Sequence, residues 1–148
     1  MKKMMIEKSV NIKATPEQVW KVLTQDDLTR QWYAVFSAGT YARTDNWKQG
    51  SRVDFVDATN CGMIGTVAVH DPSTKLVIQY EGQIVNGVED FTSDIAQQIK
   101  EGRESYTLLQ QDGHTQLLIA QDMTEEYFEM MSAQWDQALA KIKSLSEQ

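Results

Sequence analysis

The stretch Ala14-Thr15-Pro16-Glu17-Gln18-Val19-Trp20 decides the fold, because it marks where a first strand ends and a helix begins. Thr15 is suited to cap a helix, Pro16 fits its first position, and Gln18 can close a capping box. The residues before it, Met4 to Ala14, alternate between apolar and polar side chains, which predicts a half-buried strand. The sequence therefore predicts a strand that leads directly into a capped helix.

Composition indicates one globular domain. The chain has 148 residues, of which 41% are hydrophobic and 24% charged, and it is long enough to bury a sizeable core. Because it contains no linker, repeat or low-complexity tract, we expect residues 1–148 to form a single domain. The 21 acidic and 14 basic residues give a net charge of -7, which argues against nucleic acid and anionic membranes as partners.

The N-terminus and the cysteine content indicate the compartment. Met1-Lys2-Lys3 resembles the start of a signal peptide, but the apolar run that follows is only Met4-Met5-Ile6. We therefore expect neither an export signal nor a membrane span. Cys61 is the only cysteine, so an internal disulfide is excluded. These features predict a cytoplasmic protein.

The middle of the chain is predicted to be mostly strand. Asp26 can cap a second short helix, in which Leu28 and Trp32 lie four residues apart. Alternation and intervening turn residues predict six further strands at Val35–Arg43, Arg52–Ala58, Met63–His70, Lys75–Glu81, Arg103–Gln110 and His114–Gln121. Short connections favour antiparallel pairing. The exception is Gln83–Gly102, which carries a helix cap at Thr92-Ser93-Asp94 and is expected to be a lid or a mobile loop.

The C-terminus is predicted to form one long amphipathic helix from Glu125 to Ser146. Its apolar residues recur at spacings of three and four, at Phe128, Met131, Trp135, Leu139, Ile142 and Leu145. Thr124 is suited to cap it. The helix would run about 33 Å at 1.5 Å per residue, so its apolar face needs a sheet to cover it.

These elements resemble the START-like (SRPBCC) superfamily, and within it the group similar to the C-terminal domain of the activator of Hsp90 ATPase. The matching motifs are Ala14–Trp20, Leu28–Trp32, Trp47–Ser51, Gly65–Val67, Asp71-Pro72 with Leu76, and Trp135–Leu139. The resemblance implies a helix-grip fold of the α+β class. In that fold a curved antiparallel sheet of about seven strands wraps around the long C-terminal helix, and two short helices follow the first strand. It also implies a cavity between sheet and helix, which in this superfamily commonly holds hydrophobic molecules.

Side chains on inward faces of the predicted elements are the candidates for lining such a cavity. They are rings and one thioether, at Trp32, Tyr33, Phe36, Phe55, Tyr80, Tyr106, Met131 and Trp135. The alternative is that these side chains fill the core without any ligand. Neither a cofactor nor a metal is expected, because no pattern that binds one occurs in the sequence.

No catalytic residue is assigned. His70 and His114 lack metal-ligand spacing and are interpreted as surface residues. Cys61 has no neighbouring base, so we expect it to be a spectator. Four charged residues are expected to form ion pairs on the surface: Arg52, Glu81, Arg103 and Glu104. The alternative is that they supply polar groups inside the cavity.

Three functions follow from these features. The first is the binding of a small hydrophobic molecule. The second, implied by the resemblance alone, is partnership with an Hsp90-type chaperone. The third and least favoured is an enzyme of the cyclase or hydrolase kind, which requires a buried polar group with a perturbed pKa, such as Glu81, Glu104 or Tyr106. Ligand identity and oligomeric state stay open.

Overall fold

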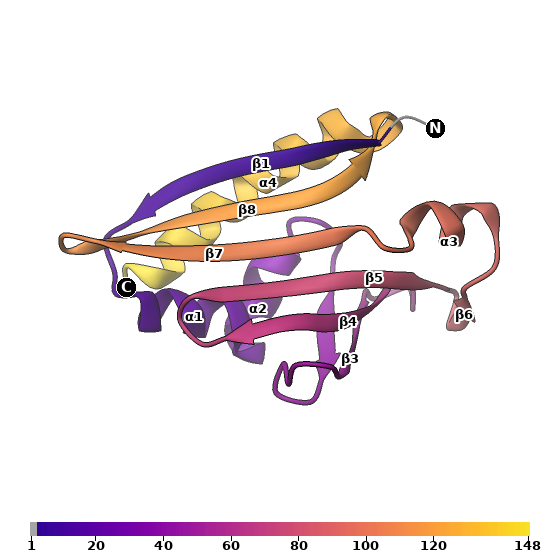
Figure 1. Ribbon diagram of the computed structural model, residues 1–148, viewed down its shortest axis with the longest axis horizontal. Coiled ribbons are helices and arrows are strands. Elements are labelled where there is room, and N and C mark those ends of the chain that lie inside the picture. The colour runs from indigo at the N-terminus through magenta and orange to yellow at the C-terminus, as the bar shows by residue number, and fades with distance from the viewer. Residues whose placement is uncertain (1–2) are drawn as a thin grey trace.

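The computed structural model describes residues 3–148 and has a curved antiparallel sheet with the long C-terminal helix on one face (Figure 1). The strands are β1 (Lys3–Ile12), β2 (Tyr41–Thr44), β3 (Arg52–Val56), β4 (Gly62–Asp71), β5 (Lys75–Val85), β6 (Val88–Asp90), β7 (Arg103–Gln111) and β8 (His114–Thr124). The helices are α1 (Pro16–Thr24), α2 (Asp26–Tyr33), α3 (Asp94–Ile99) and α4 (Glu125–Ser146). The predicted α+β helix-grip fold is confirmed.

The strands follow the order β1-β8-β7-β5-β4-β3-β2, and β6 pairs with β5. Among residues 3–148 the sheet has eight strands, one more than predicted, because the chain turns back through Asn86-Gly87 to form β6. Both turn residues have positive φ, of 51° and 81°, which suits Asn and Gly. Helix α4 lies behind β1, β8 and β7, so the sheet covers its apolar face (Figure 1).

The predicted start of α1 is confirmed. The Gln18 backbone N–H donates to Thr15 Oγ1 at 3.2 Å, and the Thr15 N–H donates to Gln18 Oε1 at 3.0 Å. The next helix begins differently from the prediction, because Gln25 rather than Asp26 is its N-cap and makes no side-chain cap. The Trp32 indole N–H donates to the Val22 carbonyl at 2.9 Å, which ties α2 to α1.

The strand predicted at Val35–Arg43 is wrong over its first two thirds. Residues 34–40 form turns, and β2 begins only at Tyr41. Within this segment the Phe36 N–H donates to the Tyr33 carbonyl at 2.9 Å, continuing the turn beyond α2. Val35 and Phe36 pack partly buried against the core. Their apolar character therefore reflects loop packing rather than strand pairing.

Helix α4 is divided along its length. Its second half is buried through Ala138, Leu139 and Ile142, whereas Tyr127 and Met130 in its first half are 49% and 53% exposed. Thr124 is the N-cap residue of α4, as predicted, but its side chain makes no capping bond, and its Oγ1 is buried without a hydrogen-bond partner among the described residues. Across residues 3–148 no helix is both long enough and apolar enough to cross a membrane.

Candidate functional site

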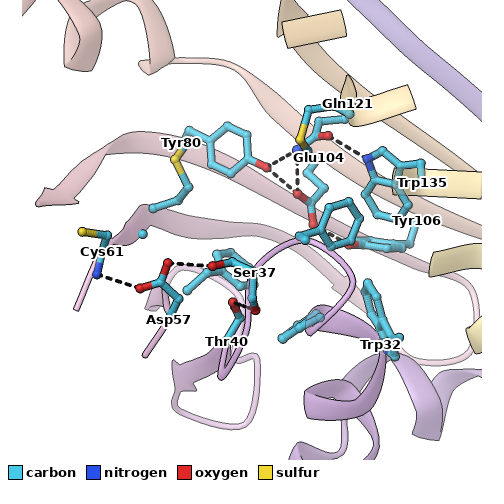
Figure 2. A pocket seen from close by; sticks show the side chains of 16 residues that line it. Trp32, Ser37, Thr40, Asp57, Cys61, Tyr80, Glu104, Tyr106, Gln121 and Trp135 are labelled. Carbon is cyan, nitrogen blue, oxygen red and sulfur yellow. Dashed lines mark hydrogen bonds between the residues drawn. The ribbon is translucent and has the colours of Figure 1, made fainter. Parts of the chain in front are cut away.

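A cavity of about 190 Å³ lies between the sheet and the first half of α4. Its walls come from α2 and the turn after it, from the strands β3, β4, β5, β7 and β8, and from α4. Figure 2 shows polar side chains at two places around it. The inner group comprises Tyr80, Glu104, Tyr106 and Gln121, and the outer group Ser37, Thr40, Asp57 and Cys61.

The structure brings all the candidate lining residues to this one cavity: Trp32, Tyr33, Phe36, Phe55, Tyr80, Tyr106, Met131 and Trp135. Many of these rings pack edge to face. The centroids of Trp32 and Tyr33 are 4.5 Å apart, and those of Phe36 and Trp135 are 4.9 Å apart. Trp32 and Trp135 are each only 1% exposed. The same rings therefore belong to the core and line the cavity.

The inner polar group is organised around the carboxylate of Glu104. Tyr80 Oη donates to Glu104 Oε1, and Tyr106 Oη donates to Glu104 Oε2. Gln121 Nε2 donates to the same Oε1 at 3.1 Å and to Tyr80 Oη at 2.9 Å. Glu104 thus accepts three hydrogen bonds, all from neutral donors. The expectation of a surface ion pair for Glu104 is wrong, because β7 turns this side chain inward.

Strand geometry explains how this group assembles. Glu104 and Tyr106 are two residues apart on β7 and therefore share a face. Gln121 is the partner of Glu104 in the register of β8 with β7. Tyr80 lies on β5 two residues from Ile78, which is the partner of Glu104 in that pairing. Three adjacent strands therefore deliver the group.

Burial controls the protonation of this group. It raises the pKa of Glu104, although hydrogen bonds from Tyr106 and Tyr80 oppose the rise. Burial and the nearby Glu104 also hold the pKa of both tyrosines well above its ordinary value. The two phenols therefore remain protonated donors at neutral pH.

The outer polar group surrounds Asp57. Its Oδ2 accepts from Ser37 Oγ at 2.8 Å, and its Oδ1 accepts from Thr59 Oγ1 at 2.6 Å and from the Cys61 N–H at 3.1 Å. These hydrogen bonds, the one from Thr59 foremost, lower the pKa of Asp57 to about 2. A negative charge therefore stands beside the partly exposed Cys61 at this side of the cavity.

Other residues considered in the sequence lie elsewhere. His70 is half-buried rather than on the surface, and its Nδ1 lies 2.6 Å from the Trp47 carbonyl. His114 lies at the start of β8 beside a turn. Arg52 pairs with Asp54 and Glu89, as a surface residue would. The other two charged candidates, Glu81 and Arg103, are absent from the cavity lining. Within residues 3–148 no group of three His, Cys, Asp or Glu side chains is arranged to hold a metal.

The segment Gln83–Gly102 does not cover the cavity. None of its residues is among those lining the cavity within the described chain. Instead β6 and α3 lie at one end of the sheet (Figure 1), where Ser93 caps α3 by accepting from the Ala96 N–H at 3.1 Å. The expectation of a lid over the ligand is wrong.

A family model described as "Activator of Hsp90 ATPase homolog 1-like protein" matches residues 13–147. The chain belongs to this family. Its motifs had implied the relationship, and the match extends over nearly the whole sequence. Membership in the activator of Hsp90 ATPase homolog 1-like family also places the chain in the START-like superfamily. No curated protein matches the sequence.

Solved structures share the fold of this family member at low identity. The Aha1 dimer from Colwellia psychrerythraea has a TM-score of 0.74 and 18% identity, covering 97% of this chain and 96% of that one. MLL2253 from Mesorhizobium loti has a TM-score of 0.70 and 17% identity, covering 96% of both chains. CalU16 from Micromonospora echinospora has a TM-score of 0.65 and 14% identity, covering 98% and 85%. Such identities support similarity of fold alone.

Several lining residues of this family member were not predicted. Gln121, Ser37, Thr40 and Met63 line the cavity but carry no motif. The sequence did contain a signal for Glu104. It lies two residues before Tyr106 in the same predicted strand, and residues two apart in a strand share a face. With Tyr106 predicted to face inward, Glu104 had to face inward as well.

Proposed function

We propose that this protein binds a small, largely hydrophobic molecule in the cavity between the sheet and α4. The observation that carries the proposal is the cavity itself, with aromatic walls and one convergent polar group around Glu104. Ligand sites generally combine an apolar lining with a few placed polar groups, which fix the ligand's orientation.

The cavity volume limits the ligand. At about 190 Å³ it lies below the roughly 300–1,000 Å³ of sites for drug-sized molecules. We therefore expect a molecule with a single ring or a short chain. The apolar part would contact the rings, and a polar end would reach the hydroxyls of Tyr80 and Tyr106.

Binding is tested by titrating the protein with 2-phenylethanol and following the indole N–H signals of Trp32 and Trp135 by NMR. We expect both signals to shift, while the signal of Trp20, which does not line this cavity, stays in place. If the rings only fill the core, no saturable shift will occur.

A pair of variants at Ser37 locates the binding. Ser37 is exposed and lines the cavity, and its hydroxyl bonds Asp57 at 2.8 Å. Ser37→Phe removes this hydrogen bond and adds a ring at the cavity, so it should weaken binding. Ser37→Ala removes the same hydrogen bond without adding a ring, so binding should persist. Equal affinities for the two variants would contradict binding in this cavity.

Family membership supports a second function, stimulation of an Hsp90-type chaperone. The measurement is the ATPase rate of Hsp90 with and without this protein. An unchanged rate at saturating protein would exclude stimulation. Ser37→Phe then separates the two functions, because blocking the cavity should leave a surface-mediated stimulation intact.

A further inference from the structure

We propose that the ligand of this cavity is an amine, held as its ammonium ion by Glu104 among the surrounding aromatic rings. This inference rests on the proposed binding function and names the ligand class for the same site. It follows from the charge of the cavity, the free acceptors around Glu104 and the chemistry of the walls.

The lining of the cavity carries negative charge, and no positively charged side chain among the described residues balances it. Within residues 3–148 its lining contains two carboxylates, Glu104 and Asp57, and neither Lys nor Arg. Among the described residues no cation lies within 4.0 Å of the Glu104 carboxylate. Its neighbour Arg103 is directed to Gln79 instead, with Nη2 at 3.2 Å from Oε1. Within the part of the chain that the structure describes, the inner carboxylate therefore accepts hydrogen bonds from neutral groups only.

Glu104 is half-buried, and a partly dehydrated carboxylate without a counter-ion is costly because neutral donors compensate only in part. Part of this cost is already included in the folded state, so a cation that enters the cavity gains the attraction with little further dehydration of Glu104. Burial also raises the pKa of this group, which is the expected sign of an anion lacking a cationic partner.

Acceptor positions remain free for an ammonium group. A carboxylate offers about four lone-pair positions, and the hydrogen bonds from Tyr80, Tyr106 and Gln121 fill three of them. The remaining position is on Oε2, beside the Tyr106 hydroxyl, whose oxygen can accept as well as donate. An ammonium has three donors and no acceptor, so it fits this set of acceptors.

The walls favour a cation further. Trp32, Tyr106 and Trp135 pack against one another, with centroid separations of 6.2, 6.2 and 6.1 Å, and all three line the cavity. An ammonium ion over the face of such a ring, within about 6 Å of its centroid, is attracted to it, most strongly in the case of Trp. An anionic ligand would instead meet the like charges of Glu104 and Asp57.

The test compares three probes of matched shape: 2-phenylethylamine, 2-phenylethanol and 3-phenylpropanoate. Their affinities for the purified protein are measured by calorimetry at neutral pH. We expect the amine to bind about tenfold or more tightly than the alcohol, as one charge-assisted hydrogen bond supplies. The acid should bind weakest. An alcohol that binds as tightly as the amine, or an acid that binds tightest, would overturn the inference while the proposed function stands.

Two variants test whether Glu104 causes the preference for the amine over the alcohol. Glu104→Gln should abolish the preference of the amine over the alcohol, while the alcohol still binds. Glu126→Gln, at an exposed position in α4, removes the same charge and should keep the preference. An unchanged preference in folded Glu104→Gln would contradict the proposal. If Glu104→Gln does not fold, the comparison of probes on the native protein still decides. Absence of binding by all three probes would remove the proposed function as well.

Discussion

The indole N–H of Trp135 donates to Gln121 Oε1 at 2.7 Å, across the boundary between α4 and the sheet. Because an indole nitrogen only donates, this contact fixes the orientation of the amide. The amide NH₂ is thereby directed to Glu104 and Tyr80. The helix thus determines how the polar group on the sheet is arranged.

Replacing Trp135 by Phe should destabilise the protein through this contact. The change leaves Gln121 Oε1 buried without its donor, a loss of about 1–3 kcal/mol in addition to lost packing. The free energy of unfolding is measured in urea. The control is Trp20→Phe at a half-buried position, which should cost less. Equal costs for the two variants would show that the hydrogen bond contributes nothing.

Replacing Glu104 by Gln should change how stability depends on pH. Because burial raises the pKa of Glu104 above its ordinary 4.5, the folded protein holds this proton more tightly than the unfolded chain does. The free energy of unfolding therefore falls as pH rises from 4.5 through the higher pKa of the folded state. Gln cannot ionise, so the variant lacks this fall.

The measurement is urea unfolding of wild type and Glu104→Gln at about pH 4 and about pH 7.5. The stability of the variant relative to wild type should increase towards the higher pH. Glu126→Gln corrects for the loss of one exposed carboxylate. A relative stability that falls towards the higher pH would contradict the direction given for Glu104.

Replacing Thr15 by Ala should cost about 1 kcal/mol of stability, because the N-cap of α1 is lost. Thr15 does not line the cavity, so the affinity of the folded variant for 2-phenylethanol should stay the same. Thermal unfolding and calorimetry measure the two quantities. A selective loss of binding would show that the cap has a role beyond the fold.

Replacing Gly62 by Ala should prevent normal pairing of β3 with β4. A Cβ at this position would lie 1.6 Å from the Phe55 carbonyl oxygen, so the strands would have to separate. The control is Gly87→Ala, where a Cβ meets nothing within 4 Å and only the φ of +81° is unfavourable. We expect the control to cost about 1–2 kcal/mol, because Ala at this φ is strained, and Gly62→Ala to cost clearly more in the same urea measurement. Equal costs would argue against the close approach of these strands.

The sequence was sufficient to predict those elements that depend on residues close together in the chain. The capping box at Thr15 and the apolar face of α4 each depend on residues within a few positions of one another. Phe36 shows where such signals fail, because burial alone does not distinguish a packed turn from a strand. Thr124 fails for another reason: a residue type suited to capping does not ensure that its side chain makes the bond.

The aromatic residues that line the cavity could be predicted from the sequence, but the hydrogen-bonded group around Glu104 could not. Strand alternation was enough to select Phe55, Tyr80 and Tyr106, and helical spacing was enough to select Met131 and Trp135. The Glu104 group depends on the register of three strands, because Tyr80 and Gln121 reach it only through pairings distant in sequence. No local pattern specifies such a register. The inward direction of Glu104 followed from its spacing to Tyr106 on β7, but its partners on β5 and β8 did not.

The difference in burial between the two halves of α4 should affect how fast each half opens. Its first half has exposed side chains at Tyr127 and Met130 and begins at Thr124 without a side-chain cap, whereas its second half is buried. Local opening is easiest where few apolar contacts must be broken. Amide hydrogens in the first turns of α4 should therefore exchange with solvent sooner than those beyond Ala138.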